Sequence, residues 1–241
     1  AEKLATVGVL ASGIAHEIGT PLGVVRGRTE MLARKLGPDH PEAKGTTVIL
    51  EEIGRISRTI QELLDFARVS QAEVTAVPVR PAAAAVLDLL AFEARKRKVG
   101  LGLDVPDDLP PLAAHPDQLK QVLVNLVLNG LDACAAGGKV SVRARPGARG
   151  TVVVEVSDDG AGIHEALRHR VFDPFFTTKK RGKGTGLGLT MAAQIVRNHG
   201  GEIDLESAVG RGTRVVVTWP AAAQAEERHG TPGRRAHSRG G

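Results

Sequence analysis

Apolar residues recur every seven positions along the beginning of the chain. The residues with this spacing are Leu4, Ala11, Ile18, Val25 and Leu32, with Val7 and Ile14 at the intervening positions. Such a repeat is typical of the seam of a coiled coil and predicts a long helix. Gly37 and Pro38 interrupt it, and a second apolar series with alternating four- and three-residue steps then runs from Ile49 to Ala67. The pattern predicts two long helices, the second ending near Ser70, folded into a hairpin.

A hairpin of two such helices leaves its apolar seam uncovered. Pairing two copies into a four-helix bundle buries that seam without any further chain. We therefore predict a homodimer formed through residues 1–72.

Beyond the segment 73–78, which we interpret as a linker, helical and strand patterns alternate up to Pro220. Apolar periodicity predicts helices at 83–97, 115–136 and 190–199. Short β-type runs predict strands at 100–105, 139–145, 152–157, 202–207 and 213–219. This mixture predicts an α/β sandwich, rather than a doubly wound sheet, as a second domain over residues 79–220. Residues 221–241 lack apolar periodicity, and we expect them to be disordered.

Composition narrows the class of protein only slightly. The 241 residues, 42% of them hydrophobic, suffice for one ordinary domain and a smaller helical one. The net charge is +5, but 32 basic residues are scattered among 27 acidic ones, so charge does not indicate a nucleic-acid partner. The single cysteine, Cys134, excludes an internal disulfide and has no metal-ligand spacing around it. The lack of a disulfide framework favours the cytosol, and no apolar run approaches the roughly 20 residues that cross a bilayer.

His16 and Glu17 adjoin each other on the first predicted helix, and Thr20 follows one turn later on the same face. The heptad pattern places His16 on the outward side, where an ordinary surface histidine is the simpler interpretation. Glu17, however, can hydrogen-bond the imidazole or accept its proton, as a neutral nucleophile with a pKa of about 6.5 requires. Pro21 cannot donate to the carbonyl of Glu17, so we expect the helix to loosen or bend beyond the histidine.

Asn125 and Asn129 lie one turn apart and share one face of the helix predicted at 115–136. The opposite stripe provides the core contacts, through Leu119, Val122, Leu126 and Leu131. Two amides on the free face can therefore serve a ligand. Mg²⁺ prefers oxygen ligands, keeps several waters and bridges phosphates, so one Asn oxygen with phosphate oxygens is a sufficient site.

Two glycine-bearing segments carry the remaining chemistry. Asp158, followed by Gly160 and Gly162, ends a predicted strand, and by itself this is a tight turn. The run 184–189, Gly-Thr-Gly-Leu-Gly-Leu, opens a predicted helix, so N–H groups and the helix dipole can hold phosphate oxygens there. It is neither a P-loop nor a dinucleotide-binding fingerprint. The polar residues 177–184 before it suit a mobile lid.

In this order, the motifs resemble the catalytic core of a sensor histidine kinase of a two-component system. The matching segments are the phosphoacceptor box at 16–22, the N box at 125–129, the first glycine box at 158–163, the second glycine box at 184–189 and the last nucleotide-contacting turn at 210–213. The resemblance spans residues 4–219. It joins a dimerisation and histidine-phosphotransfer hairpin to the ATP-binding domain that is shared with Hsp90-type ATPases.

The resemblance implies that His16, polarised by Glu17, takes a phosphoryl group from ATP and passes it to an aspartate of a response-regulator receiver domain. It also implies that Thr20 could position water for dephosphorylation of that regulator. In the ATP site it assigns Mg²⁺ to Asn129 and the adenine amino group to Asp158. The other nucleotide contacts that it implies are Asn125, Gly160, Gly162, Thr178, Lys179, Gly184, Thr185, Gly186, Leu187, Gly188 and Thr213.

Two alternatives remain open, one because of departures from the family pattern and the other because other ATPases share the fold of the ATP-binding domain. Gly19 stands where the family usually has Lys, Arg or Asn, Gly130 replaces a usual Ala, and Asp132 sits where some members carry a basic residue. A dimeric scaffold with a degenerate site is therefore one alternative. An ATPase of the Hsp90, mismatch-repair or topoisomerase type is the other, and the histidine-bearing hairpin argues against it. Because the sequence starts inside a helical pattern without Met, we expect a cytoplasmic part of a longer sensor.

Overall fold

The computed structural model describes residues 2–67, 73–179 and 184–223, with side chains described except at 2–17, 58, 59 and 61–67. The chain forms two compact units. One comprises residues 1–71 and 173–187, and the other comprises residues 72–172 and 188–241. None of the helices in the described ranges combines the length and apolarity that crossing a membrane requires.

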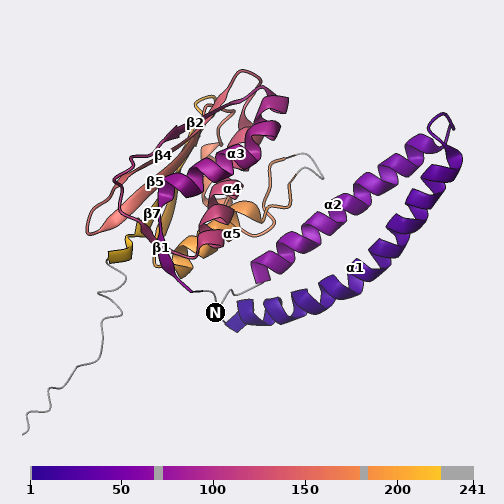
Figure 1. Ribbon diagram of the computed structural model, residues 1–241, viewed down its shortest axis with the longest axis horizontal. Helices are drawn as coiled ribbons and strands as arrows, with labels where there is room; N and C mark the ends of the chain where they lie inside the picture. The colour runs from indigo at the N-terminus through magenta and orange to yellow at the C-terminus, as the bar shows by residue number, and fades with distance from the viewer. Residues whose placement is uncertain (1, 68–72, 180–183, 224–241) are drawn as a thin grey trace, which may run out of the picture. The chain divides into compact units, whose positions relative to one another are not determined.

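The first unit contains a hairpin of two long helices. α1 (Glu2–Leu36) and α2 (Ala43–Ala67) pack along each other (Figure 1), which confirms the predicted hairpin. Gly37 follows α1 with a φ of 75°, a left-handed conformation that glycine adopts without strain. α1 runs unbroken through Pro21 and curves along its length (Figure 1), so the helix bends without breaking. The predicted end of the second helix, near residue 70, lies outside the described residues.

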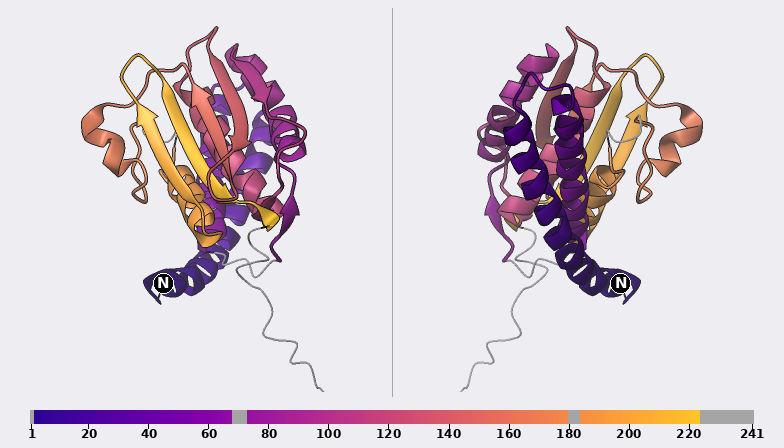
Figure 2. Two further views of the ribbon diagram at one scale, coloured as in Figure 1. Left: turned by 90° about the vertical axis from the view of Figure 1, so that its left-hand side faces the viewer. Right: turned by 90° about the vertical axis from the view of Figure 1, so that its right-hand side faces the viewer.

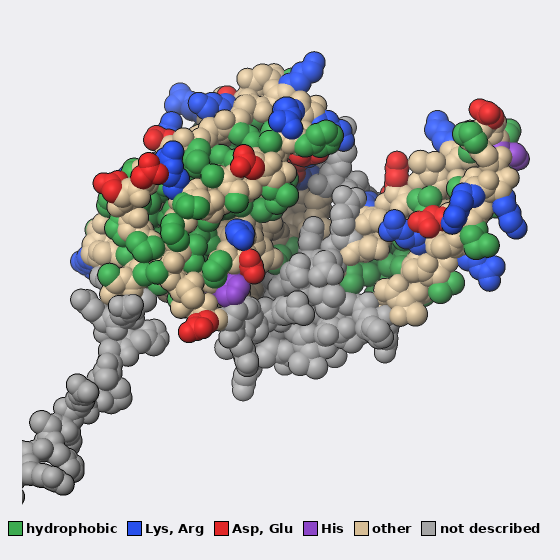
Figure 3. Space-filling model, viewed as in Figure 1, with side chains coloured by type: hydrophobic (Ala, Val, Ile, Leu, Met, Phe, Trp, Pro, Cys, Tyr) green, Lys and Arg blue, Asp and Glu red, His purple; other side chains and the backbone are tan. Residues whose placement is uncertain are grey.

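Within the hairpin, few of the described apolar residues at heptad spacing are buried. Ile53 is buried, as are Thr29 and Thr46, whose hydroxyls donate to carbonyls of their own helices at 2.8 Å. Five other apolar residues at heptad spacing remain 39–49% exposed, and they are Ile18, Val25 and Leu32 on α1 and Ile49 and Ile56 on α2. Figure 3 shows hydrophobic side chains reaching the surface of the hairpin. One copy of the hairpin thus leaves an apolar stripe uncovered.

The second unit is an α/β sandwich. Its five-stranded sheet has the order β2 (Gly100–Asp104), β4 (Lys139–Pro146), β5 (Thr151–Asp158), β7 (Thr213–Pro220) and β6 (Glu202–Ser207). β2 and β4 are parallel and the other pairs are antiparallel. Three helices, α3 (Val79–Arg97), α4 (Pro116–Ala133) and α5 (Gly188–Asn198), cover one face of the sheet (Figure 2). This architecture confirms the predicted fold class.

The core lies between the sheet and these helices. Alternate strand residues point inward, and they are Val140, Val142, Val152, Val154, Val156, Val215, Val217 and Trp219. The predicted stripe on α4, namely Leu119, Val122, Leu126 and Leu131, is buried against them. This packing leaves the other face of α4, with its two asparagines, outside the core.

Three short elements have no counterpart in the sequence prediction. β1 (Thr75–Val77), inside the segment interpreted as a linker, pairs with β3 (Leu112–Ala114) as an antiparallel ribbon. η1 (Glu165–Arg170) is a 3₁₀ helix. Elements of this length are too short to display a hydrophobic period. Residues 221 and 222, predicted to be disordered, are instead attached, because their N–H groups donate to the carbonyls of Gly150 and Pro111. Residues 224–241 lie outside the described residues.

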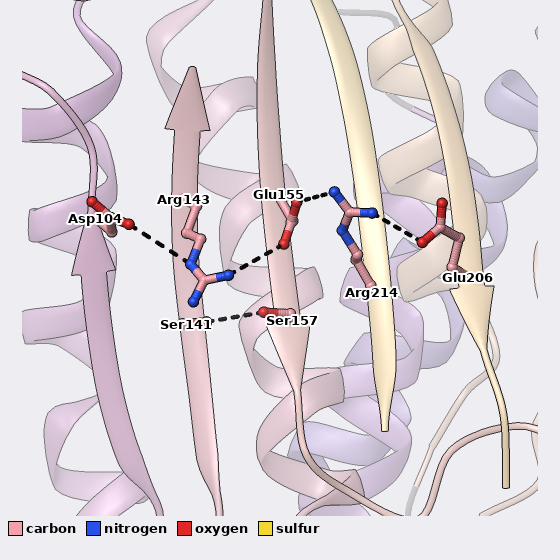
Figure 4. A network of polar contacts seen from close by, with 7 residues as sticks. All are labelled: Asp104, Ser141, Arg143, Glu155, Ser157, Glu206 and Arg214. Carbon is pink, nitrogen blue, oxygen red and sulfur yellow. Dashed lines mark hydrogen bonds and ion pairs between the residues drawn. The ribbon is translucent and has the colours of Figure 1, made fainter. Parts of the chain in front are cut away.

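The solvent face of the sheet carries a row of alternating charges across all five strands (Figure 4). Arg143 lies between Asp104 and Glu155, with N–O distances of 3.7 and 3.9 Å. Arg214 lies between Glu155 and Glu206, with distances of 2.5 and 3.0 Å. The hydrogen bond to Glu155, followed by the one to Glu206, raises the pKa of Arg214. The row therefore ties β5 to β7 through Glu155, three residues before Asp158, and Arg214, the residue after Thr213.

We expect the Glu155→Gln variant to lose about 1–2 kcal/mol of unfolding free energy, because charge-assisted hydrogen bonds are worth about that much. The side chain of Glu155 is only 12% exposed, so solvent screens its contacts weakly. Urea unfolding measures the loss. Glu202→Gln is the matched control, since Glu202 is exposed on β6 and makes no ion pair within the described part of the chain. Equal effects of the two substitutions would contradict a stabilising role for the row.

Candidate functional site

Asp158, at the end of β5, is a half-buried carboxylate that backbone N–H groups hold in place. Its Oδ1 accepts hydrogen bonds from the backbone N–H groups of Gly160, at 2.9 Å, and Thr213, at 3.2 Å. Both donors use the same oxygen, so Oδ2 has no hydrogen bond within the described residues. Burial raises the pKa of Asp158, and the two N–H donors partly offset that rise. A half-buried carboxylate oxygen is thus left to accept from a ligand.

The turn after Asp158 is packed between two other backbone segments. A side-chain carbon on Gly160 would come within 2.5 Å of the Ala133 carbonyl at the end of α4. Gly162 has a φ of 69°, and a side chain there would overlap the Ala208 carbonyl. The protein's own packing therefore requires both glycines, whether or not a base passes close to them.

Asn125 on α4 faces the first turn of α5. A side-chain carbon added at Gly188 would lie 3.6 Å from Oδ1 of Asn125. The Nδ2 atom of Asn125 is buried and has no hydrogen-bond partner among the described residues. A buried amide without a partner is rare, so this group is available to a ligand beside the start of α5.

Gly130, one residue after Asn129, is explained by close packing. A methyl group at Gly130 would lie 3.0 Å from Cγ2 of Val140 and 3.3 Å from Cβ of Asp158. Glycine therefore lets α4 approach the sheet directly behind Asp158. This departure from the family pattern fits the site and is no sign of degeneration.

Asn129 lies one turn after Asn125 and is half-buried. The described residues contain no group of three or more His, Cys, Asp or Glu side chains that could hold a metal ion. An amide oxygen is nevertheless a suitable ligand for Mg²⁺, which binds few protein groups and completes its shell with water and phosphate oxygens. The donor set thus fits a magnesium ion brought in with a nucleotide.

Asp132 is turned toward α3. Its Oδ1 pairs with Nη1 of Arg97, whose Nε also donates to Glu93 at 2.9 Å. The hydrogen bond to Asp132 is the largest cause of the raised pKa of Arg97. Asp132 is thus neutralised within the helical layer. Two lysines that could supply positive charge in the predicted lid, at 180 and 183, lie outside the described residues.

The segment 173–187 contains the predicted lid residues, and a backbone hydrogen bond joins its two ends. The N–H of Phe175 donates to the carbonyl of Gly186 at 3.1 Å. Thr178 is exposed, and the N–H of Lys179 donates to the hydroxyl of Thr177 at 3.2 Å. Gly184, Thr185 and Gly186 are half-buried, and Leu187 is fully buried. Just outside the segment, Thr190 donates to the carbonyl of Phe172 at 3.0 Å and joins its two flanks.

The candidate catalytic residues of the hairpin all lie in α1. The side chains of His16 and Glu17 fall outside the described residues, and Thr20 is exposed. A side-chain carbon at Gly19 would meet no atom within 4 Å, so packing does not require glycine there. The structure therefore places these residues along one helix without fixing their side-chain geometry.

Hydrogen bonding identifies two further residues beside Asp158 that were not among the candidate site residues. Oδ1 of Asp159 accepts from the N–H of Lys139 at 2.7 Å, and the thiol of Cys134 lies 3.4 Å from the same oxygen. The Lys139 N–H is the largest cause of the lowered pKa of Asp159. Ser207, at the end of β6, hydrogen-bonds the backbone N–H of Ile163. A serine at a strand end carries no sequence signal, whereas the acidic pair Asp158-Asp159 did offer one.

Two family models match the chain. Residues 7–72 match the His Kinase A (phospho-acceptor) domain, and residues 114–223 match the histidine kinase-, DNA gyrase B- and HSP90-like ATPase family. The two matched regions coincide with the helical hairpin and with most of the α/β sandwich.

Known proteins are similar to this chain over most of its length. Sensor histidine kinase ZraS of Klebsiella oxytoca is 35% identical over 95% of this chain and 49% of ZraS. The catalytic domain of histidine kinase ThkA is 30% identical, with a TM-score of 0.56, over 62% of this chain and 97% of that one. ThkA in complex with response regulator protein TrrA is 26% identical, with a TM-score of 0.67, over 92% of this chain and 64% of that one. The chain spans about half the length, or less, of the curated relatives that it matches.

We expect Cys134, the single cysteine, to react slowly with iodoacetamide. Burial, followed by the hydrogen bond to Asp159 and the charges of Asp158 and Asp159, raises the pKa of the Cys134 thiol to about 11. Since only the thiolate reacts, the alkylation rate measured by mass spectrometry should keep rising up to about pH 11.

Asp159→Asn removes one of the charges that disfavour the thiolate, so this variant should be alkylated faster than the wild type at pH about 8. The urea-unfolded chain provides the reference rate. A folded wild type that reacts as fast as the unfolded chain would contradict the assigned environment of Cys134.

Proposed function

Because this chain belongs to the sensor histidine kinase family, we propose that it transfers the γ-phosphoryl group of ATP to His16. The observation that carries the proposal is the carboxylate of Asp158, which is half-buried, anchored through one oxygen and open at the other. A carboxylate in this arrangement suits an amino group such as that of adenine. From His16 the phosphoryl group passes to an aspartate of a response-regulator receiver domain. The solved complex of ThkA with its response regulator supports this type of partner.

Adenine is held at the junction of β5 and β7. Oδ2 of Asp158 accepts from the amino group of the base, and Thr213 lies directly opposite Asp158 in the strand register. Gly160 and Gly162 form the turn beside them. Ionised Asp158 is the useful form, because a neutral carboxyl would accept more weakly.

The phosphates lie at the start of α5. The first N–H groups of a helix have no partners within the helix and attract anions. Asn125 adds its unpartnered amide beside Gly188. We assign the remaining phosphate contacts to Thr178, Lys179, Gly184, Thr185, Gly186 and Leu187. Asn129 would hold Mg²⁺, which when bound offsets the negative charge of the phosphates.

His16 acts as the nucleophile. One nitrogen of its neutral imidazole attacks the γ-phosphorus, the bond from that phosphorus to the bridging oxygen breaks, and ADP leaves. Glu17 accepts or holds the proton of the other ring nitrogen, so that no full positive charge remains on the ring. Phosphohistidine then donates its phosphoryl group to the carboxylate of the receiver aspartate. Thr20, one turn after His16, positions the water that hydrolyses the aspartyl phosphate of the regulator and so ends the signal.

The working form is a homodimer. The uncovered stripe of Ile18, Val25 and Leu32 on α1 continues as Ile49 and Ile56 on α2. Burying apolar side chains contributes about 25 cal/mol per Å², so pairing two stripes favours a four-helix bundle. Sedimentation of the chain as a monomer at micromolar concentration would contradict this assembly.

Incubation with γ-labelled ATP and Mg²⁺ should label the wild-type chain and leave His16→Ala unlabelled. The label should be lost in acid and retained in base, as expected for a phosphoramidate. His16→Ala should bind ADP as the wild type does, because the substitution lies outside the ATP-binding domain. A label that survives in His16→Ala, or that resists acid, would contradict His16 as the acceptor.

The same labelling reaction, followed by a phosphatase assay, tests the proposed role of Thr20. Thr20→Ala should be labelled as efficiently as the wild type, since Thr20 takes no part in the attack on ATP. Release of phosphate from a phosphorylated receiver domain should fall at least about tenfold if Thr20 orients the water. Full phosphatase activity in Thr20→Ala would remove that role.

A further inference from the structure

Ser207, the last residue of β6, joins three segments around the candidate adenine site. Its Oγ accepts a hydrogen bond from the backbone N–H of Ile163 at 2.8 Å and donates one to the carbonyl of Gly212 at 2.8 Å. The same Oγ lies 3.0 Å from the hydroxyl oxygen of Thr213. Ile163 ends the first glycine box, whereas Gly212 and Thr213 belong to the turn that opens β7. The hydroxyl of Ser207 therefore connects the first glycine box to the turn that opens β7.

The direction of each hydrogen bond follows from a count of protons. A serine hydroxyl has one proton and two acceptor positions. The carbonyl of Gly212 can only accept, so the proton of Ser207 points there. The N–H of Ile163 fills one acceptor position. In the third contact Ser207 must therefore accept, and Thr213 must donate its hydroxyl proton to Ser207.

This assignment leaves Thr213 with acceptor positions only. Thr213 is the register partner of Asp158, and its N–H already donates to Oδ1 of that residue. Oδ2 of Asp158 is an acceptor as well. A ligand at this junction thus meets two acceptors and no side-chain donor from this pair.

We propose that Ser207 is a positioning residue that fixes the Thr213 hydroxyl as an acceptor and so makes the site select a 6-amino purine over a 6-oxo purine. The inference rests on the proposed function of the site. Adenine offers an amino donor at C6, whereas hypoxanthine and guanine place an acceptor oxygen there. Ser207 acts through Thr213 and does not itself contact the nucleotide.

The simpler interpretation is that Ser207 only holds the β6–β7 turn. A structural role would weaken all nucleotides alike when Ser207 is replaced. The proposed role predicts a change in the ratio of two affinities, because the proton of Thr213 becomes free to rotate and donate to an oxo group. ADP and IDP are suitable probes, since their bases differ at C6 and they share the sugar and phosphates.

Isothermal titration of the full chain with ADP and IDP tests the proposal. The wild type should bind ADP at least about 100-fold more tightly than IDP. The reason is that the oxo group of IDP leaves the acceptors of the site without a donor. Ser207→Ala should reduce the ratio about tenfold, the equivalent of one hydrogen bond. Ser141→Ala is the matched control, because Ser141 also makes a hydroxyl pair, with Ser157 at 2.9 Å on the solvent face (Figure 4). It should leave the ratio unchanged.

A double-mutant cycle supplies the decisive comparison. In Thr213→Val there is no hydroxyl to reorient, so adding Ser207→Ala should not change the ratio further. If Ser207→Ala does not fold, Ser207→Cys replaces it in the same comparison. Cysteine is close to serine in shape, but its thiol is only a weak donor and a weak acceptor. An equal loss of ADP and IDP affinity in Ser207→Ala, or the same shift in the Thr213→Val background, would overturn the proposal. A wild type that binds neither nucleotide would instead overturn the proposed function on which it rests.

Discussion

The arrangement of the ATP-binding domain depends on one shared acceptor, Oδ1 of Asp158. Two backbone N–H groups, from the glycine turn after β5 and from the start of β7, converge on that oxygen. Each such bond contributes on the order of 1–3 kcal/mol when the acceptor is charged. The bonds anchor Oδ1, and Oδ2 has no hydrogen bond within the described residues, so it can accept from a ligand.

Packing around this carboxylate follows from the need to keep it half-buried. Gly130 brings α4 close behind it, Gly160 brings the turn against the end of α4, and the row of charges on the opposite face ties β5 to β7. Burial raises the pKa of Asp158, because the carboxylate loses part of its solvation there. A ligand donor restores that interaction, which makes binding of an amino group favourable.

The fold could be predicted from the sequence wherever hydrophobic periodicity extends over several turns or strand residues. The heptads predicted the hairpin, and the alternation in β5 and β7 predicted the sheet. The ribbon of β1 and β3 was missed because three-residue strands show no period. Residues 221–222 were missed because their attachment consists of one buried alanine, Ala221, and two backbone hydrogen bonds, which leave no pattern in the sequence. Side-chain composition cannot reveal such contacts.

For the candidate site, the motifs indicated which residues to consider and hydrogen-bond geometry supplied reasons for them. The family resemblance counted Gly160 and Gly162 among the nucleotide contacts, whereas crowding by Ala133 and Ala208 already requires glycine there. Gly130 looked like a loss of function, and its neighbours Val140 and Asp158 explain it by packing. Ser207 could not be found, because the direction of its bonds depends on Gly212 and Thr213 and also on Ile163, which is 44 residues away in the chain.

The most direct test of this account is the affinity of Asp158→Asn for ADP and IDP. The two N–H donors require an oxygen at the Oδ1 position, so the introduced amide must direct its NH₂ toward the ligand. We predict that ADP binding weakens about 100-fold while IDP binding strengthens, which would reverse the preference of the site. An Asp158→Asn protein that keeps wild-type affinity for ADP would contradict the claim that the free oxygen of Asp158 recognises the base.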